Sequence, residues 1–234
     1  MWQGDGVNPS DPDAEPVPPA RPAATVIVAR EVHGEFEILF LKRSEVGAFA
    51  GMWVFPGGRV DDNDVGHDEQ SRAAAAAVRE AHEEVAVRVH PHKLIALSHW
   101  TPPAIAPKRF TTWFFVAPWA GDDAQIDNHE IVDARWIRPS DAIAAGMPMA
   151  PPTHVTLVTL AEAGSFDGLR GLIDQRGVER FVTVPSQHEG ALVLLWDNDA
   201  GYATADASLP GRRHRMVLRD GQPLTYERSD GESH

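Results

Sequence analysis

The stretch that decides the fold is Phe55–Val87, FPGGRVDDNDVGHDEQSRAAAAAVREAHEEVAV. A Gly-Gly turn leads through an acidic loop into a helical run that ends in REAHEE. Glu80, Glu83 and Glu84 stand at i, i+3 and i+4, so at about 100° per residue they share one helix face. Each like-charge neighbour costs the helix roughly 0.2–0.5 kcal/mol. The triplet is either a solvated acidic face or a divalent-cation site, because clustered carboxylates suit Mg²⁺ or Mn²⁺.

The helix itself is predicted over residues 69–86. Its alanine run has high helix propensity and permits close packing. One apolar stripe at helical spacing consists of Ala74, Ala77, Val78, Ala81 and Val85. We expect this stripe to pack against a sheet, with the glutamate face turned away from it.

Strands are predicted on both sides of this helix. TVIVAR and EILFLKR are separated by HGE, a hairpin signal, and MWVFPGG is a short strand that ends in a turn. LIALSHW, RFTTWFFVA and DARWIR follow as strands, and PPTHVTLVTLAEAG predicts a second helix with Pro152 in its first turn and Gly164 at its end. Beyond Phe181, the runs RFVTV, ALVLLW, HRMVL and PLTYE predict further strands. This order favours a mixed α/β layout.

Composition narrows the function classes. The 234 residues are 43% apolar, and 21 basic against 34 acidic side chains give a formal charge of −13. That balance argues against a DNA or long-RNA binder but leaves a small anionic substrate open. The chain has no cysteine, which excludes disulfides and cysteine zinc sites. Because it lacks a membrane-length apolar run and a signal-peptide pattern, we expect a cytoplasmic protein without membrane contact.

The residues FPGG … RE-x-x-EE-x-x-V resemble the Nudix box, G-x5-E-x7-R-E-U-x-E-E-x-G-U, in which U is aliphatic. The positions that match are Arg79, Glu80, Glu83, Glu84 and Val87, and FPGG matches the turn usually found before the box. The resemblance covers roughly residues 23–165. It implies the Nudix α/β/α sandwich with a mixed sheet, and hydrolysis of a diphosphate linked to another group.

Three positions depart from the box. Ala81 stands at the first aliphatic place, and Ala86 replaces the final glycine. Counting back from Arg79 over the seven intervening residues of the pattern leads to Ser71, where the family has a glutamate that commonly holds the arginine. We therefore expect Asp68 or Glu69 to hold Arg79.

Roles at the site follow from the resemblance. Glu83 and Glu84 are expected as the principal ligands of Mg²⁺ or Mn²⁺, and Glu80 as a ligand or as the base that takes a proton from water. The Gly57 carbonyl is expected to complete the shell. Arg79 belongs to the same catalytic set. Relatives often recruit one more carboxylate from a later loop, and here Glu130 is the candidate, with a plain surface charge as the alternative.

The segment before the box points to a substrate. LFLKRSEVGAFAGMWVFPGG resembles the coenzyme A diphosphatase-like branch, L-L-x-x-R-[SA] … G-x3-F-P-G-G, through Arg43, Ser44 and Gly51. The spacing from Ser44 to Gly51 is one residue short, and Gly47 and Ala48 stand where the branch has a second arginine. The phrases WTPP, PKRF and APPTH are similar to peroxisomal-type members and their bacterial relatives.

These features predict a nucleotide substrate with a diphosphate bond, with coenzyme A or its thioesters first and ADP-ribose or another dinucleotide as the alternative. Arg43 and Ser44 are predicted to bind substrate. Lys108 and Arg109 are predicted to hold its phosphates, although such a pair at a strand start is often plain surface. Pro102 is a weak marker of ADP-ribose cleavage. The scattered histidines do not favour zinc.

Outside the box region the sequence contains fewer features that indicate structure or function. Residues 1–22 contain six prolines and are expected to form a flexible tail, residues 23–165 the Nudix domain, and residues 166–234 a β-rich extension. The extension is expected either to cover the site or to form a homodimer contact. A catalytically silent Nudix-fold nucleotide-binding or regulatory module is the alternative class. The three retained glutamates favour the enzyme.

Overall fold

A mixed β-sheet forms the centre of the molecule. The computed structural model describes residues 19–229, apart from residues 48, 105, 107, 108, 122, 127 and 128. Within that part of the chain the sheet has eight strands, ordered β3-β2-β1-β6-β5-β8, with β4 paired to β1 and β7 to β2. Its strands are β1 Arg21–Val32, β2 Glu35–Arg43, β3 Trp53–Val54, β4 Gly57–Arg59, β5 Ile95–Thr101, β6 Phe110–Pro118, β7 Ile131–Ile137 and β8 Glu179–Val182. The pairs β1–β6 and β5–β8 are parallel, whereas β1–β2 and β5–β6 are antiparallel.

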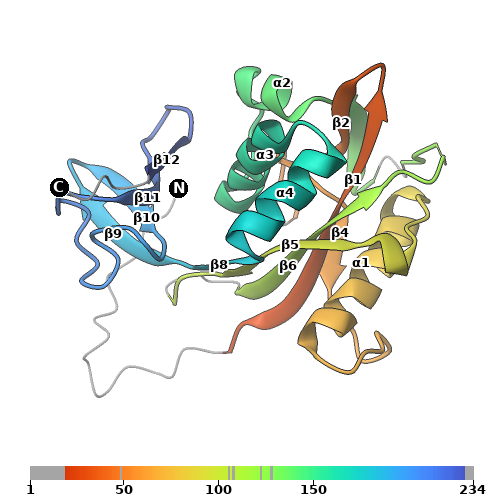
Figure 1. The fold of residues 1–234 in the computed structure, drawn as a ribbon, viewed down its shortest axis with the longest axis horizontal. Helices are drawn as coiled ribbons and strands as arrows, with labels where there is room; N and C mark the ends of the chain where they lie inside the picture. The colour runs from red at the N-terminus through yellow and green to blue at the C-terminus, as the bar shows by residue number, and fades with distance from the viewer. Residues whose placement is uncertain are drawn as a thin grey trace.

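Helices cover both faces of this sheet. They are α1 Glu69–Val85, α2 Pro139–Ala144, α3 Pro151–Ala163 and α4 Phe166–Arg176, with a 3₁₀ turn, η1, at Pro91–Lys93. Figure 1 shows α1 on one face of the sheet and the group α2, α3 and α4 on the other. The predicted α/β/α sandwich with a mixed sheet is confirmed, as is the hairpin at HGE, where His33 and Gly34 both adopt positive φ angles between β1 and β2.

Each face of the sheet has its own apolar core. On the α1 side, small alanines bring the helix close to Val26, Val28 and Phe115 of the sheet. The buried residues of α1 are Ala73, Ala76, Ala77, Ala81 and Val85. The predicted stripe was therefore partly wrong, since Ala74 and Val78 are only half-buried and Ala73 and Ala76 take their place. A run of five alanines carries no size contrast, so the sequence did not fix which of them face inward.

The caps of α1 follow from its end residues. Asp68 is the N-cap, and its carboxylate accepts the Ser71 backbone N–H. The Ser71 hydroxyl in return accepts the Asp68 backbone N–H, which completes a capping box. At the other end Ala86 takes φ 56°, the left-handed conformation that favours glycine. The family glycine is lost at this position, but the backbone turn that it serves is kept.

The C-terminal region adds both a helix and a second sheet. β8 joins the edge of the main sheet, and the chain then enters a sheet of four strands within the described residues, ordered β12-β11-β10-β9. These strands are β9 Val184–His188, β10 Ala191–Leu195, β11 Arg213–Leu218 and β12 Thr225–Ser229. RFVTV, predicted as one strand, is divided at Thr183 between the two sheets. Sequence analysis missed α4, whose Gly168 and Gly171 lower helix propensity and whose Leu169 is held by burial in the core.

The extension shares a core with the main domain. Phe181, Trp196 and Met216 are buried in the same apolar cluster as Val155 and Leu160 of α3. The division into residues 23–165 and 166–234 stays a prediction, and most of the predicted tail lies outside the described residues. β1 already begins at Arg21. Among the described helices, none has the length and apolar character needed to cross a membrane.

Candidate active site

The candidate site lies where α1 crosses β4. Gly57 and Gly58 pair with Thr25 and Ala24 of β1, which places the Gly-Gly backbone directly over the helix. A Cβ atom built on Gly58 would lie 2.2 Å from Glu80 Oε1, and one on Gly57 would lie 2.5 Å from the Ala24 carbonyl oxygen. Only glycine therefore permits this approach of backbone to carboxylate.

Glu80 and Glu84 lie together beneath this turn. The Gly57 N–H donates to Glu84 Oε2 at 3.0 Å, and Glu80 packs against Gly58. The side chains of Glu80 and Glu84 are largely withdrawn from solvent, whereas that of Glu83 is 57% exposed. The three glutamates thus divide into an inner pair one helical turn apart and an outer member.

Burial sets the protonation of the inner pair. Desolvation raises the pKa of Glu84 to about 7, and the neighbouring charges of Glu80 and Glu130 raise it further. The hydrogen bond from the Gly57 N–H acts in the opposite direction and lowers it. Desolvation also raises the pKa of Glu80, although the hydrogen bond from Arg79 opposes it. Two withdrawn carboxylates with raised pKa values require a positive partner in order to ionise fully.

Arg79 is held by Asp64. Its Nε and Nη2 donate to the two carboxylate oxygens of Asp64 at 3.1 and 2.9 Å, and Nη2 also donates to the Arg59 carbonyl. Nη1 donates to Glu80 and Glu83 at 2.8 and 2.9 Å. Burial alone would raise the pKa of Asp64, but the bonds from Arg79 and from the Asp61 N–H lower it. Asp64 is therefore ionised and fixes the guanidinium.

The expectation that Asp68 or Glu69 holds Arg79 was wrong. Asp68 is engaged as the α1 N-cap with Ser71, while Glu69 contacts His99 at 3.1 Å and Trp113 at 3.2 Å. The sequence did contain a signal for Asp64. It stands six residues after Gly58, the interval that the box gives to its glutamate, and residues 65–78 are a stretch twice the length of the seven in the pattern. Counting forward from the glycine finds the partner that counting back from Arg79 misses.

Arg43 and Glu130 come to the same cluster from distant parts of the chain. Arg43, the last residue of β2, forms an ion pair with Glu130 through Nη2, and its Nη1 lies 3.7 Å from Glu84 Oε1. The Ser44 N–H donates to the Glu130 carbonyl at 2.9 Å, so two backbone segments are joined here. The structure therefore brings Glu130 beside Glu84, where sequence analysis placed a later carboxylate.

The other residues predicted to bind substrate are Ser44, Lys108 and Arg109. The Ser44 hydroxyl donates to the Val46 carbonyl at 3.4 Å in the loop after β2. Arg109 lies at the start of β6, where its carbonyl accepts the Arg21 N–H. Lys108 is outside the described residues. Trp100 is buried and stacks on Phe181 with ring centroids 3.9 Å apart, so it belongs to the core.

The donor set fits a divalent cation. Among the residues that the structure describes, no three His, Asp or Glu side chains converge to form a closed metal shell. Guanidinium groups stand between the carboxylates instead: Arg79 between Glu80 and Glu83, and Arg43 between Glu84 and Glu130. Mg²⁺ commonly takes one or two carboxylates and keeps several waters, so the buried pair Glu80 and Glu84 is a sufficient protein contribution.

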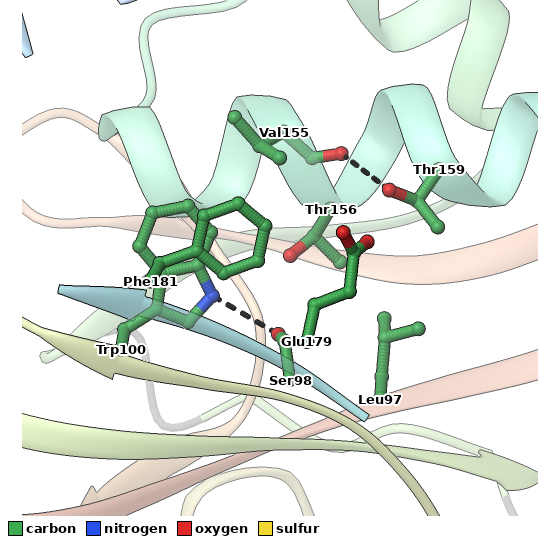
Figure 2. A pocket seen from close by; sticks show the side chains of 8 residues that line it. All are labelled: Leu97, Ser98, Trp100, Val155, Thr156, Thr159, Glu179 and Phe181. Carbon is green, nitrogen blue, oxygen red and sulfur yellow. Dashed lines mark hydrogen bonds between the residues drawn. The ribbon is translucent and has the colours of Figure 1, made fainter. Parts of the chain in front are cut away.

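A small cavity on the opposite side of the sheet is not this site. Figure 2 shows it between α3 and strands β5 and β8, with Thr156, Glu179 and Ser98 among its lining residues. Its volume of about 10 Å³ is room for roughly one water molecule. The Thr156 hydroxyl is buried there and has no protein hydrogen-bond partner. A nucleotide does not fit in such a space.

Comparison with known proteins agrees with this geometry. A family model described as the NUDIX domain matches residues 19–157. The crystal structure of a NUDIX hydrolase from Alicyclobacillus acidocaldarius is 22% identical, covers 64% of this chain and 94% of its own, and superposes with a TM-score of 0.56. A search of curated protein sequences found no match.

Two further solved structures superpose less closely. The NUDIX domain of Shewanella oneidensis NrtR complexed with ADP ribose is 19% identical, with a TM-score of 0.48, covering 66% of this chain and 92% of its own. A C. elegans Ap4A hydrolase binary complex is 22% identical, with a TM-score of 0.44, covering 66% and 98%.

The sandwich fold and the glutamate-bearing helix under a Gly-Gly turn define a hydrolase of the pyrophosphohydrolase class. Since the family model matches more than half of the chain, the protein belongs to the Nudix family.

Proposed function

We propose that the protein uses Mg²⁺ or Mn²⁺ to hydrolyse a diphosphate bond in a nucleoside diphosphate linked to another moiety. The observation that carries this proposal is the inner pair Glu80 and Glu84, withdrawn from solvent beneath Gly57 and Gly58 with raised pKa values. Strongly perturbed carboxylates that share a site are typical of catalytic centres. A silent nucleotide-binding module has no use for such a pair.

Each residue of the cluster has a proposed role. Glu80, Glu84 and the more exposed Glu83 hold the cation, with the Gly57 carbonyl and Glu130 as further oxygen ligands. A cation held by these residues would polarise the phosphate and lower the pKa of a bound water. Glu80 is either one of these ligands or the base that accepts the proton of the attacking water. Arg79, fixed by Asp64, orients Glu80 and Glu83.

Arg43 is proposed to contact the diphosphate that is cut. Its guanidinium lies 3.7 Å from Glu84, a proposed metal ligand, which supports a place near the bond that is cut. A planar guanidinium can donate two hydrogen bonds to one phosphate group. An Arg43→Lys change is therefore expected to lower kcat as well as to raise KM.

The substrate proposed first is coenzyme A or one of its thioesters. The support is the resemblance of Arg43-Ser44 and Gly51 to the coenzyme A diphosphatase-like branch. ADP-ribose or another dinucleotide is the second candidate, supported by Pro102 in WTPP. Ser44, Lys108 and Arg109 remain proposed substrate contacts, and a homodimer formed through the C-terminal extension remains a proposal that an oligomeric-state measurement tests.

A substrate panel tests the function. Wild-type protein is assayed with coenzyme A, ADP-ribose, NADH, dinucleoside polyphosphates and oxidised nucleotides, with Mg²⁺, with Mn²⁺ and in excess chelator. We expect turnover only with metal, and a loss of about 10²-fold or more in kcat for Glu84→Gln. Glu162→Gln, which removes an ion-paired glutamate on α3, is the control and keeps full activity. Nucleotide binding without any turnover would support the silent module, and full turnover in chelator would refute the metal role.

A further inference from the structure

A second polar hollow lies beside the acidic cluster. Its volume is about 310 Å³, within the size range of small-ligand pockets. The residues that line it are Arg21, Pro22, Arg59, Val60, Asp61, Asp62 and Arg72. Three arginines thus line one space, and the sequence alone had indicated no role for any of them.

The backbone fixes the walls of this hollow. Arg59 ends β4 and pairs with Ala23 of β1, while the Val60 N–H donates to the Pro22 carbonyl at 3.0 Å. From α1, Arg72 donates to the Asp64 carbonyl at 3.1 Å and to the Asp61 carbonyl at 3.0 Å, which ties down the loop between them. The hollow is therefore built from a strand ladder and a pinned loop.

The hollow begins one residue beyond the candidate catalytic centre. Gly58 packs against Glu80, and the next residue, Arg59, accepts the Arg79 Nη2 donor on its carbonyl at 2.9 Å. A substrate whose diphosphate lies at Glu80 and Glu84 therefore reaches the hollow with a neighbouring group. The two places are continuous parts of one surface of β4 and α1.

The charge of the hollow favours an anion. The whole chain carries a formal charge of −13, so an anionic ligand is repelled unless cations are gathered locally. Three arginines face two aspartates here, and one of these, Asp61, lies 3.8 Å from Arg79 and is partly offset by it. Arg72 donates its hydrogen bonds at 3.1 and 3.0 Å to two neutral carbonyls. Guanidinium groups bind phosphate through paired hydrogen bonds.

We propose that this hollow binds a phosphomonoester group that the substrate carries away from the bond being cut. The inference rests on the proposed function, and it narrows the substrate to nucleotides with an extra phosphate, such as a 3′-phosphorylated adenosine. Arg43 lies in the acidic cluster beside Glu84 and Glu130, where it is proposed to contact the diphosphate, so it is not assigned to this group. Arg59 and Arg21 discriminate between substrates, whereas Arg72 shapes the loop.

Calorimetric titration with two products tests this inference. Adenosine 5′-monophosphate and adenosine 3′,5′-bisphosphate are titrated separately into wild-type protein in the presence of chelator. We expect the bisphosphate to bind about tenfold more tightly, as the hydrogen bonds of a charged group warrant. Arg59→Gln and Arg21→Gln should each reduce this ratio to about threefold or less. Arg170→Gln, at an exposed arginine of α4, is the matched control and keeps the ratio.

The outcomes separate the two proposals. Equal affinity for the two nucleotides, no binding of either, or a ratio unchanged in both variants would overturn the phosphomonoester site. Circular dichroism melting of each variant confirms that it is folded before it is titrated. A preserved ratio in a protein that cleaves no member of the substrate panel would refute the proposed function and leave the anion site standing. Cleavage of a panel substrate by a protein that binds the two nucleotides equally would support the proposed function and refute the anion site.

Discussion

Two buried carboxylate sites of this molecule are built in opposite ways. In the C-terminal region Asp199 accepts both donors of Arg215 at 2.6 and 2.7 Å, together with the backbone N–H groups of Gly201 and His214. Burial alone would raise the pKa of Asp199, but these bonds lower it. On α1, Glu84 is half-buried, and desolvation raises its pKa to about 7, with the charges of Glu80 and Glu130 adding to the rise.

The contrast separates a structural site from a functional one. The Asp199–Arg215 pair has complementary charge within the protein, so it is complete in the folded chain. The Glu80–Glu84 pair keeps like charges together, with Arg79 bound to Glu80 and Arg43 only 3.7 Å from Glu84, and we propose that a cation completes it. We take two carboxylates of like charge, held close together and withdrawn from solvent, as the indicator of the proposed active site.

The largest expected effect is on stability at the complete site. Asp199→Asn leaves the Arg215 guanidinium buried, with an exposed fraction of 4%, and without its charge partner. We expect the free energy of unfolding to fall by about 3–5 kcal/mol, measured by urea denaturation. Asp167→Asn, which removes a partner from the exposed Arg170 pair, is the control and should cost less than about 1 kcal/mol. Equal losses in the two variants would remove the contrast between the sites.

The next effect concerns pH at the incomplete site. The pKa of Glu84 is about 7 in the folded protein, against an ordinary value of 4.5, so ionisation costs more in the folded state. The stability that the protonated group contributes is complete below pH 4.5 and is lost as the pH rises through 7. Glu84→Gln stays neutral throughout. In chelator, we compare the free energy of unfolding of Glu84→Gln with that of wild type. From acidic pH to about pH 8, the difference should shift in favour of the variant by on the order of 3 kcal/mol.

That comparison needs urea denaturation of both proteins across the pH range. A constant difference between wild type and Glu84→Gln would show that the carboxyl titrates normally. The comparison with Asp199 would then fail, because both carboxylates would be satisfied by the protein alone.

A smaller effect, on kcat, is expected at the ion pair between Asp64 and Arg79, which lies within the acidic cluster. Asp64 neutralises Arg79 as Asp199 neutralises Arg215, but it does so inside the catalytic cluster. Asp64→Asn should lower kcat about tenfold, roughly 1.4 kcal/mol in barrier, because Arg79 loses its anchor. KM should change little. Asp61→Asn alters a weaker contact, 3.8 Å from the same arginine, and should keep kcat within about twofold.

Steady-state kinetics on both variants decides this point. Asp64→Glu restores the carboxylate at the cost of an added methylene and should recover part of the lost kcat. If Asp61→Asn and Asp64→Asn lowered kcat equally, Asp64 would not be the residue that positions Arg79.

Local patterns predicted the fold and most of the acidic cluster. Helical spacing placed Glu80, Glu83 and Glu84 on one face of α1, and the family resemblance suggested Glu130, which forms an ion pair with Arg43 in the structure; their roles stay a prediction. Asp64 was missed because the insertion after it moves it away from Arg79 in sequence but not in space. Helix α4 was missed because its two glycines conceal a helix that is stabilised by the burial of Leu169. The grouping of Arg21, Arg59 and Arg72 depends on strand pairing and a pinned loop, which no single stretch of sequence records.

The central claim is that the Glu80–Glu84 pair requires a divalent cation, and Mn²⁺ binding tests it most directly. Titration calorimetry near neutral pH compares wild type, Glu84→Gln and the control Glu162→Gln. The account predicts that wild type and Glu162→Gln bind Mn²⁺ equally, and that Glu84→Gln binds it about tenfold or more weakly, because a neutral amide replaces a charged oxygen ligand. Equal Mn²⁺ affinity in wild type and Glu84→Gln would contradict it.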